Sequence, residues 1–479
     1  MEQVTQDALR VWQAGVDAVR ADRVVREQVR WDGRILEIQE KRLDLAHAKR
    51  WIIVGAGKAA GGMLEGVLQV LEGTEEHPRI CGWVNLPEGS IPERLKSRAG
   101  GIEICEARPA GVNEPTAKVV DGTREILRLI DQATSEDVVL FLLSGGGSAL
   151  LCAPVEWMSL ETKVAITRRL SSRGARIQEL NAVRRAISQV KGGGLARRSR
   201  AGQLITLVIS DVLGDPLEMI GSGPTVLEPA PDGALAARIL QRYAPDEFPE
   251  VVARLTQPEL TQGELTHAGK RQEAQDQAQG KSAHTFVLAN NATAVEAAVR
   301  EAQRLGYRVQ SESRVEGEGT AEQVGQELAA IVKELVPGSG WISGGEPTMV
   351  LPDVAVRGVG GRNQHVVLKA GSELLGDIPE SFALVSGGTD GEDGATQAAG
   401  AWIDHGWLDR SVASRDKILE ALERCDSNTV LSATGHLLLT GPTHTNVCDL
   451  RVALRSGSPV EILPRSVSRR DPAPVVDLP

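Results

Sequence analysis

The sequence predicts an α/β protein of two domains, in which mostly parallel sheets are flanked by helices. Short apolar runs of strand length alternate along the chain with helical patterns, as expected for parallel strands that are covered on both faces. The chain also has 479 residues, which is more than one ordinary hydrophobic core holds. We therefore expect two large cores.

The elements follow from the spacing of apolar residues. The chain opens with Leu9, Trp12, Val16 and Val19 at helical spacing, which predicts a packed amphipathic helix. Strands are expected at residues 50–54, 138–143, 204–210, 284–290, 340–343 and 382–386, and helices at 114–133, 291–306 and 319–336.

The domain boundaries are set by two stretches that are poor in large apolar residues. Residues 258–283 are polar and rich in Gln, so we interpret them as a linker or a surface excursion. Residues 463–479 form a Pro-rich tail. The predicted domains are then residues 1–257 and 284–462.

Composition excludes several classes of partner. The net charge of −11 argues against nucleic acid or an anionic membrane as the main partner. The five cysteines are scattered, so neither a disulfide framework nor a structural zinc site is indicated. No signal-peptide core or membrane-spanning apolar run is visible, and we expect a cytoplasmic protein.

Glycine-rich or Ser/Thr-rich turns come after the apolar runs in both halves of the chain. Examples are "GAGKAA" (55–60), "SGGGSALL" (144–151), "ISGGEPT" (342–348) and "SGGTDGEDG" (386–394). In open α/β sheets, ligands bind beyond the carboxyl ends of the strands, where glycine lets backbone N–H groups approach an anion. One such turn alone is more often only a tight connection, but the whole set predicts a phosphate or carboxylate site lined from both domains.

The first turn has two readings. "GAGKAA" is similar to the GxGxxA dinucleotide fingerprint, yet Lys58 lies inside it and the next strand-like run ends in Asn85 without an acid for a ribose. A lysine there suits a transferring phosphoryl group or a substrate carboxylate. A solvated surface lysine is the alternative.

Further charged residues stand beside other glycines. Lys191 precedes the "GGG" of residues 192–194 and is a candidate phosphate contact, whereas most neighbouring arginines fit a solvated helix face. Arg362 in "GVGGRNQH" is placed to pair with a carboxylate or phosphate through two N–H groups, and Asn363 and Gln364 offer orienting amides.

Acidic residues also occupy these turns, where they fit either Mg²⁺ binding and proton transfer or ordinary turn formation. They are Asp211, Asp215, Glu346, Asp390, Glu392 and Asp393. His365 and His444 lie in the same loops, and for both we rank a structural role slightly ahead of a catalytic one.

Taken together, the ordered motifs resemble the glycerate 2-kinase family that carries a MOFRL domain and is often described as hydroxypyruvate reductase. They are "GAGKAA", "LSGGGSALL", "NAVRRAISQVKGGGLA", "ISDVLGDP" with "IGSGPT", "ISGGEPT", "GGRNQ", "SGGTDGEDGATQAAGA" and "TGPTHTNVCDL". The resemblance implies a Rossmann-like N-terminal domain, a MOFRL-type C-terminal domain and an active site in the cleft between them. It also implies ATP-dependent phosphorylation of D-glycerate to 2-phosphoglycerate, with Mg²⁺ or another divalent cation.

By motif, the family's catalytic lysine falls on Lys58 and its essential arginine on Arg362; we add Asp211 as a third catalytic candidate. Arg362 is expected to hold the glycerate carboxylate, and Lys58 and Lys191 to neutralise the transferring phosphoryl group. The candidate residues for substrate or nucleotide binding are Gly55, Gly57, Ser144, Gly145, Gly146, Gly147, Ser148, Asn181, Arg184, Lys191, Gly345, Glu346, Asn363, Gln364, Thr389, Thr443 and Asn446, and those for the metal are Asp215, Asp390 and Asp393.

Two departures from the family pattern keep other functions open. His365 stands where Glu is common, and Cys448 stands where Asn is more usual. The alternatives are an NAD(P)H-dependent hydroxypyruvate reductase and a non-catalytic sensor of sugar acids or nucleotides. We expect D-glycerate and ATP as partners and leave a homodimer open.

Overall fold

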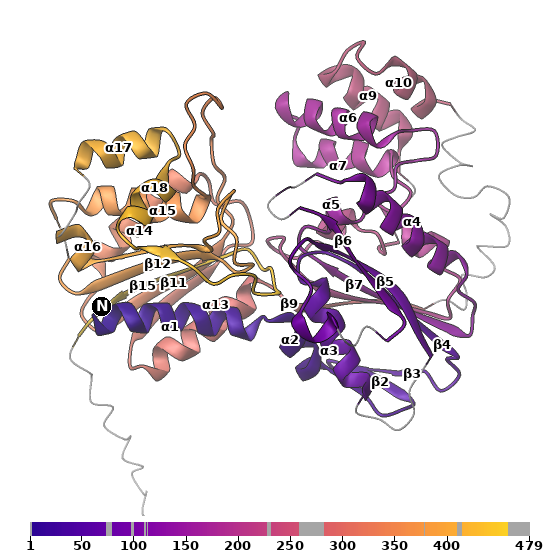
Figure 1. The fold of residues 1–479 in the computed structure, drawn as a ribbon, viewed down its shortest axis with the longest axis horizontal. Coiled ribbons are helices and arrows are strands. Elements are labelled where there is room, and N and C mark those ends of the chain that lie inside the picture. The colour runs from indigo at the N-terminus through magenta and orange to yellow at the C-terminus, as the bar shows by residue number, and fades with distance from the viewer. Residues whose placement is uncertain are drawn as a thin grey trace, which may run out of the picture.

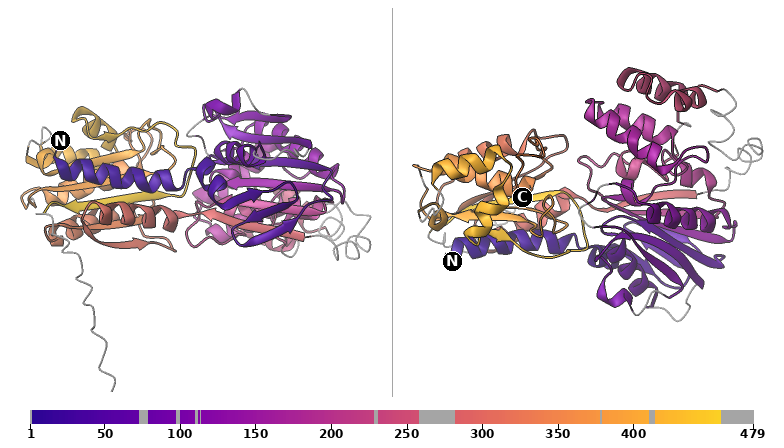
Figure 2. Two further views of the ribbon diagram at one scale, coloured as in Figure 1. Left: turned by 90° about the horizontal axis from the view of Figure 1, so that it is seen from below. Right: turned by 45° about the horizontal axis from the view of Figure 1, so that its top comes forward.

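The computed structural model describes residues 2–72, 79–96, 100–109, 112, 114–227, 231–257, 282–377, 379–409 and 414–457. Two domains lie side by side, each built on a six-stranded sheet (Figures 1 and 2). The predicted α/β class is confirmed. The predicted tail and the predicted linker, apart from its last two residues, lie outside the described residues.

The sheet of the first domain is parallel throughout and has the order β6-β5-β4-β7-β8-β9. Its strands are β4 (Arg50–Ala56), β5 (Arg79–Pro87), β6 (Ile102–Arg108), β7 (Asp137–Ser144), β8 (Gln203–Ile209) and β9 (Ser282–Ala289). Every residue of the central strand β7 is buried, as the apolar run there predicts for a strand covered on both faces. All carboxyl ends therefore meet at one edge.

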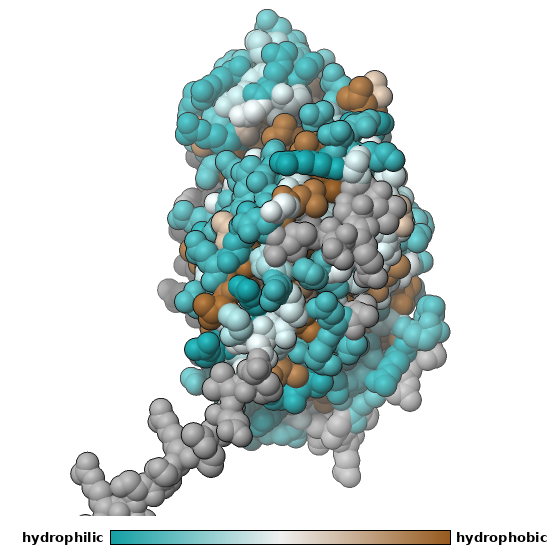
Figure 3. Space-filling view, turned by 90° about the vertical axis from the view of Figure 1, so that its left-hand side faces the viewer, coloured by the Kyte–Doolittle hydropathy of each residue, from teal (hydrophilic) through white to brown (hydrophobic). Residues whose placement is uncertain are grey.

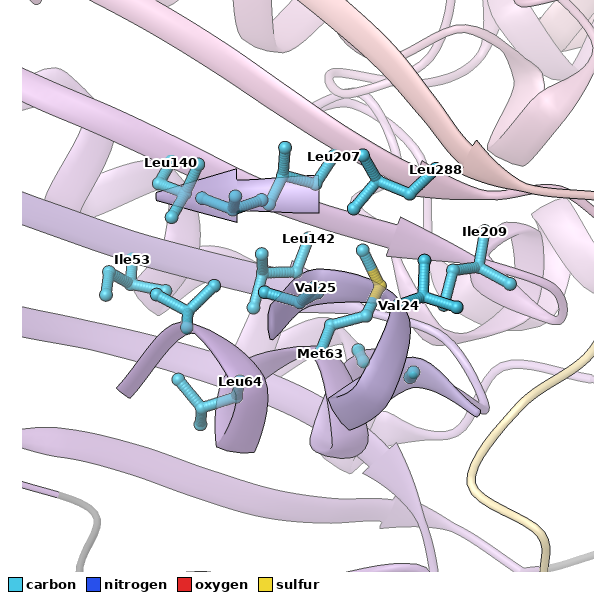
Figure 4. Close-up of a cluster of buried hydrophobic side chains, with 14 of the residues drawn as sticks. Val24, Val25, Ile53, Met63, Leu64, Leu140, Leu142, Leu207, Ile209 and Leu288 are labelled. Atoms are coloured by element: carbon cyan, nitrogen blue, oxygen red, sulfur yellow. The ribbon is translucent and has the colours of Figure 1, made fainter. Parts of the chain in front are cut away.

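Helices cover both faces of this sheet. One face carries α2 (Ala21–Gln28) and α3 (Ala60–Glu72), and the other carries α4 (Ala117–Asp131), α5 (Gly147–Leu150) and α8 (Gly194–Arg198). Figure 4 shows Val24, Val25, Met63 and Leu64 of α2 and α3 beside strand residues such as Leu142. Next to them is a small antiparallel sheet of β1 (Val29–Trp31), β2 (Ile35–Ile38) and β3 (Lys41–Asp44).

Four further helices form a cap with a core of its own (Figure 1). They are α6 (Leu160–Ser172), α7 (Ile177–Ala186), α9 (Gly233–Tyr243) and α10 (Pro249–Leu255). Ser159 and Asp232 begin α6 and α9, because each side chain accepts a hydrogen bond from an unpaired backbone N–H of the first turn.

The sheet of the second domain is mixed, with the order β10-β11-β15-β12-β13-β14. Its strands are β10 (Arg308–Ser313), β11 (Ser339–Gly345), β12 (Phe382–Gly388), β13 (Gly400–Asp404), β14 (Leu437–Leu438) and β15 (Asp449–Arg455). Only the β10–β11 pair is parallel, so the prediction of mostly parallel sheets is wrong for this domain. Strand β15 lies between β11 and β12 and runs opposite to both, and β13 runs opposite to its neighbours β12 and β14.

Helices again cover both faces. One face carries α1 (Gln3–Ala18) and α13 (Asn291–Arg304), and the other carries α14 (Ala321–Glu334), α15 (Arg362–Leu374), α17 (Arg415–Glu423) and α18 (Ser427–Ala433). Helix α16 (His405–Asp409) follows β13. The helices predicted at 114–133, 291–306 and 319–336 are confirmed as α4, α13 and α14.

Two elements lie in a different domain from the one that the predicted boundaries give them. Strand β9 starts the predicted C-terminal domain, yet it pairs with β8 of the first sheet because it completes that sheet's edge. Helix α1 starts the predicted N-terminal domain, yet it covers the second sheet, where its Trp12 Nε1 donates to Leu450 O at 3.1 Å. Figure 1 shows α1 alongside α13.

The face of the second domain in Figure 3 is mostly hydrophilic, with apolar residues scattered among the hydrophilic ones. Within the residues that the structure describes, every helix is too short or too polar to cross a bilayer. An open pocket of about 730 Å³ lies between α4 and residues 153–161, and none of the predicted site residues lines it.

Candidate active site

The turn that carries Lys58 is locked to the glycine turn after β7. Lys58 N–H donates to Gly145 O at 2.8 Å, and Ala59 N–H donates to Ser144 Oγ at 2.9 Å. Gly57 has a φ of +140°, and a Cβ there would collide with Ser144. The two turns therefore form one rigid unit at the carboxyl edge of the parallel sheet.

The side chain of Lys58 reaches the second domain. Its Nζ lies 2.7 Å from Asp390 Oδ2 and 2.6 Å from Glu392 Oε2, in the loop after β12, and the side chain is 19% exposed. Burial lowers the pKa of Lys58, but the two carboxylates outweigh burial and raise it above its usual value. Lys58 is therefore an ammonium group that joins the two domains.

Asp211 lies beside this unit, two residues after the end of β8. Its Oδ2 accepts from Asn446 Nδ2 at 3.2 Å, and Gly145 packs so closely against both that a side chain there would collide with them. Burial, followed by the negative charge of Glu346, raises the pKa of Asp211 to about 7. This carboxyl group can therefore exchange a proton near neutral pH.

Arg362 is the first residue of α15 and is held by two acids. Its Nε and Nη2 donate to the two oxygens of buried Asp449 at 2.8 and 3.0 Å, and its Nη1 donates to Glu346 at 2.8 Å. Burial lowers the pKa of Arg362, but the two acids outweigh burial, so its pKa lies above the usual value and Arg362 stays charged. Burial raises the pKa of Glu346.

Cys448 connects the Arg362 group to Asp211. Its Sγ–H donates to Asp211 O at 2.9 Å, and its Sγ lies 4.0 Å from Glu346 Oε2. Burial raises the pKa of the thiol well above its usual value, so Cys448 stays protonated and acts as a donor. The structure therefore brings Lys58, Asp211 and Arg362, the three predicted catalytic residues, to one boundary between the domains.

Asp393, a predicted metal ligand, caps a helix. Its two oxygens accept from the backbone N–H groups of Asn363 and Gln364 at 2.9 and 2.8 Å, which are the free donors at the start of α15. Burial raises the pKa of Asp393 to about 6, against the effect of these hydrogen bonds. Both oxygens of Asp393 are thus engaged with the start of α15, and its role as a metal ligand stays a prediction.

Asn363 and Gln364, predicted ligand contacts, also bind protein groups. Asn363 Oδ1 accepts from Ser386 at 2.6 Å, and Gln364 Oε1 accepts from Asn428 at 2.8 Å. In the same way, Asp215 Oδ2 accepts from Asn290, the N-cap of α13. These residues fix the elements that carry the site.

The loops of the second domain are shaped by the predicted threonines. Thr389 Oγ1 donates to Cys448 O at 2.7 Å and accepts from Val447 N–H at 2.8 Å, and Thr443 Oγ1 donates to Thr389 O at 2.6 Å. These bonds set the position of the loop that carries Asp390. Gly55 and Gly345 lie within strands and are packed closely, Gly55 against Leu142 and Gly345 against Glu318.

A second basic group lies under the glycine turn. The ammonium of Lys191, which is 1% exposed, lies 3.1 Å from Ser148 Oγ and 3.2 Å from Gly221 O, so it ties the Ser148 turn to the 220–222 loop. Burial, with Arg184 nearby, holds the pKa of Lys191 well below its usual range. Arg184 Nη1 lies 3.4 Å from Asn181 Oδ1. Lys191 thus supports the turn from within.

Three residues at this boundary are absent from the predicted set. Glu392 is one of the acidic turn residues but is outside the predicted catalytic, binding and metal residues. Asp449 lies near the end of the motif "TGPTHTNVCDL", where it begins β15, and Arg108 ends β6 outside the glycine-rich motifs. The position of Arg108 at the carboxyl end of a strand-like run was the available clue.

No metal centre is evident from side chains alone. In the ranges that the structure describes, no three His, Cys, Asp or Glu side chains are grouped so as to hold a metal ion. Asp390 is paired with Lys58, and Asp215 and Asp393 are held by the protein as above. The metal site stays a prediction.

Comparison with known proteins identifies the family. Residues 7–257 match a family described as a domain of unknown function, DUF4147, and residues 339–449 match the MOFRL family. The chain is 34% identical over 515 residues to a glycerate kinase of Danio rerio, covering 96% of this chain and 99% of that protein. It is 32% identical over 460 residues to a D-glycerate 2-kinase of Thermotoga maritima, covering 95% and 99%.

A solved structure agrees with these matches. The crystal structure of a glycerate kinase from Thermotoga maritima superposes with a TM-score of 0.74 at 31% identity and covers 95% of this chain and all of that one. The predicted resemblance is thus confirmed over nearly the full length, and the chain belongs to the glycerate kinase family.

Proposed function

We propose that this chain phosphorylates the 2-hydroxyl of D-glycerate with ATP, giving 2-phosphoglycerate and ADP, at a site between its two domains. The observation that carries this proposal is the contact of Lys58 with Asp390 and Glu392, because it joins the glycine turns of the first domain to the acidic loop of the second. The relative named D-glycerate 2-kinase supports the choice of substrate and hydroxyl.

Arg362 is suited to the carboxylate of glycerate. Asp449 holds Nε and Nη2, so the guanidinium plane is fixed, while Nη1 contacts Glu346. The side chain of Glu346 is 45% exposed and can move away from this contact. A substrate carboxylate then takes its place on Nη1, and this fixes where the 2-hydroxyl lies.

Lys58 is suited to the transferring phosphoryl group. In the transfer, the 2-hydroxyl oxygen bonds to the γ-phosphorus, the bond from that phosphorus to the β,γ-bridging oxygen breaks, and ADP leaves with the electron pair. Negative charge spreads over the phosphoryl oxygens, where an ammonium and the N–H groups of residues 145–147 stabilise it. The hydrogen bonds between the turn of Lys58 and the glycine turn after β7 hold Lys58 in place for this role.

Asp211 is suited to receive the hydroxyl proton. With a pKa of about 7 it is substantially ionised at neutral pH and is basic enough to accept a proton. Its hydrogen bond from Asn446 fixes the carboxylate toward the domain boundary.

A divalent cation fits the chemistry of the acidic loop. Kinases of known mechanism use Mg²⁺ to neutralise phosphate charge, and carboxylates are its usual protein ligands. Asp390 is the residue that we propose for this role, because its carboxylate already binds a cationic group, the Lys58 ammonium. We also propose that the first domain, whose parallel sheet is Rossmann-like, binds the ATP.

The test is a coupled assay of ADP release with D-glycerate, ATP and Mg²⁺, followed by identification of the phosphoglycerate isomer. Formation of 2-phosphoglycerate is the expected result. Consumption of NADH with hydroxypyruvate would instead establish that the chain is a hydroxypyruvate reductase. Thermal stabilisation by D-glycerate or ATP without any product would establish that it is a non-catalytic sensor of these ligands.

A further inference from the structure

A buried arginine lies at the glycine turn beside Lys58. Arg108 is the last residue of β6, is 1% exposed, and is among the largest fully buried side chains. Its Nη2 lies 3.3 Å from the point where a Cβ on Gly146 would stand, and Lys58 Cγ lies 3.4 Å from the same point. Arg108 and Lys58 therefore both pack against the space that a side chain of residue 146 would take.

The backbone of the turn makes this approach possible. Gly146 has a φ of +74°, a conformation that residues with side chains rarely adopt, and it presents no Cβ between the two cations. The main-chain O of Arg108 accepts from Glu88 N–H at 2.8 Å, which anchors the end of β6. The backbone of Arg108 is thus fixed at the carboxyl edge of the sheet, and its guanidinium reaches the turn at Gly146.

One acid of the second domain lies near both cations. Glu392 lies 2.6 Å from Lys58 Nζ; burial lowers the pKa of Arg108, and the charge of Glu392 offsets part of that decrease. The first domain therefore contributes two positive charges at Gly146, and the neutralising carboxylates come from the second domain. The side chain of Glu392 is 30% exposed, so it can leave this position without unfolding its surroundings.

We propose that Arg108 is a phosphate-binding residue for the nucleotide, and that the Glu392 carboxylate stands in the ligand-free protein where a phosphate of ATP binds. This inference rests on the proposed kinase function. A nucleotide carries several negative charges in one chain of phosphates, and Arg108 with Lys58 matches this better than a single substrate carboxylate does. Arg362 remains the residue for the carboxylate.

The test compares Arg108→Gln, Arg108→Lys and wild type by thermal stabilisation with ATP or ADP and by steady-state kinetics. We expect Arg108→Gln to lose most of the ATP-dependent rise in Tm and to raise the KM for ATP about tenfold or more, with the KM for D-glycerate within about twofold. Arg124→Gln, an exposed arginine of α4, is the matched control and should behave as wild type.

Glu392→Gln separates a binding role from a structural one. This variant removes the carboxylate but keeps the guanidinium, so its stabilisation by ATP should equal or exceed that of wild type. A loss as large as that of Arg108→Gln would overturn the proposal, because Arg108 would then act only through Glu392. An unchanged KM for ATP in Arg108→Gln, or a raised KM for D-glycerate alone, would overturn it as well.

Two arms keep the result interpretable. If Arg108→Gln fails to fold, Arg108→Lys replaces it: this variant keeps the charge but loses the forked N–H donors of the guanidinium, so we expect a KM for ATP clearly above that of wild type, and an unchanged value overturns the proposal. Nucleotide stabilisation is measured without glycerate. Failure of wild type to make 2-phosphoglycerate therefore rejects the proposed function, while the ATP-dependent Tm values still judge Arg108.

Discussion

Replacement of Lys58 by methionine tests the proposed mechanism most directly. Methionine keeps much of the length of the side chain and removes the ammonium that lies 2.7 and 2.6 Å from Asp390 and Glu392. Loss of one preorganised charge contact to a transition state costs about 2–4 kcal/mol. At about 1.36 kcal/mol per factor of ten, this predicts a fall in kcat/KM of roughly 30- to 900-fold.

The control is a second lysine that lies far from the proposed site and can be replaced by methionine in the same way. Lys49 lies just before β4, the strand that leads to Lys58. Its ammonium pairs with Glu136 at 2.7 Å on the surface, and both side chains are more than half exposed. Exposed pairs contribute little, so we expect Lys49→Met to stay within about twofold of wild type in kcat/KM. The coupled ADP-release assay measures both variants.

The size of the effect decides the role of Lys58. If Lys58→Met folds with a Tm near that of wild type and keeps kcat/KM within about threefold, the ammonium does not stabilise the transition state. A fall in kcat/KM carried wholly by a higher KM for D-glycerate would also refute the reasoning, because it would place Lys58 on the substrate carboxylate.

The remaining predictions concern pH and packing. Since Asp211 must be ionised to accept a proton, kcat/KM of wild type should rise with pH through about 7, and Asp211→Asn should lose that rise; a rise unchanged in the variant would exclude Asp211. The pKa of Asp211 in the folded protein lies above the unfolded value of about 3.9, so the folded protein should lose stability as the pH rises from about 4 to 7. Measuring Tm against pH in wild type and Asp211→Asn checks this. Gly57→Ala should destabilise the protein by about 1–3 kcal/mol in denaturant unfolding, since its φ is unfavourable and its Cβ would meet Ser144; unchanged stability would show that the turn can shift. The side chains of Arg451 and Glu318 are each 2% exposed and form an ion pair. Arg451→Met leaves the buried Glu318 carboxylate without its partner, so the free energy of unfolding should fall by about 3–5 kcal/mol. Adding Glu318→Gln should restore part of that stability.

The sequence predicts the first domain better than the second, for a physical reason. Parallel strands such as β7 are buried on both faces and so appear as continuous apolar runs. Strand β15 has the sequence "DLRVALR", whose charged residues argue against a central strand. Arg451 is nevertheless buried, because it pairs with Glu318 from a distant loop, and such a partner is not visible in local patterning.

The site shows the same limit. The position of Lys58 and Arg362 at the domain boundary was predictable, because glycines beside them mark turns near the ends of elements. The capping role of Asp393 was not predictable, because the sequence around an acid in a glycine-rich turn is the same whether that acid caps a helix or binds a metal. Arg108 was missed because its relation to Gly146 depends on the packing of β6 against the rest of the sheet.

The boundary between the domains is fixed at one edge, and this constrains how substrates enter. Val447, in the loop before β15, is fully buried in the core of the first domain that includes α2 and α3. Its neighbour Thr445 donates to Val19 O, at the end of α1, and Gly62 of α3 packs against His444 O. Asn446 and Cys448 next to this edge also bind Asp211 of the first domain. Opening the domains there would expose Val447 and break these contacts, whereas Lys58 is bound by two carboxylates of a partly exposed loop. We therefore expect relative motion of the domains to turn about residues 444–448 and to release the Lys58 ion pairs first, which would open Lys58 to an incoming nucleotide.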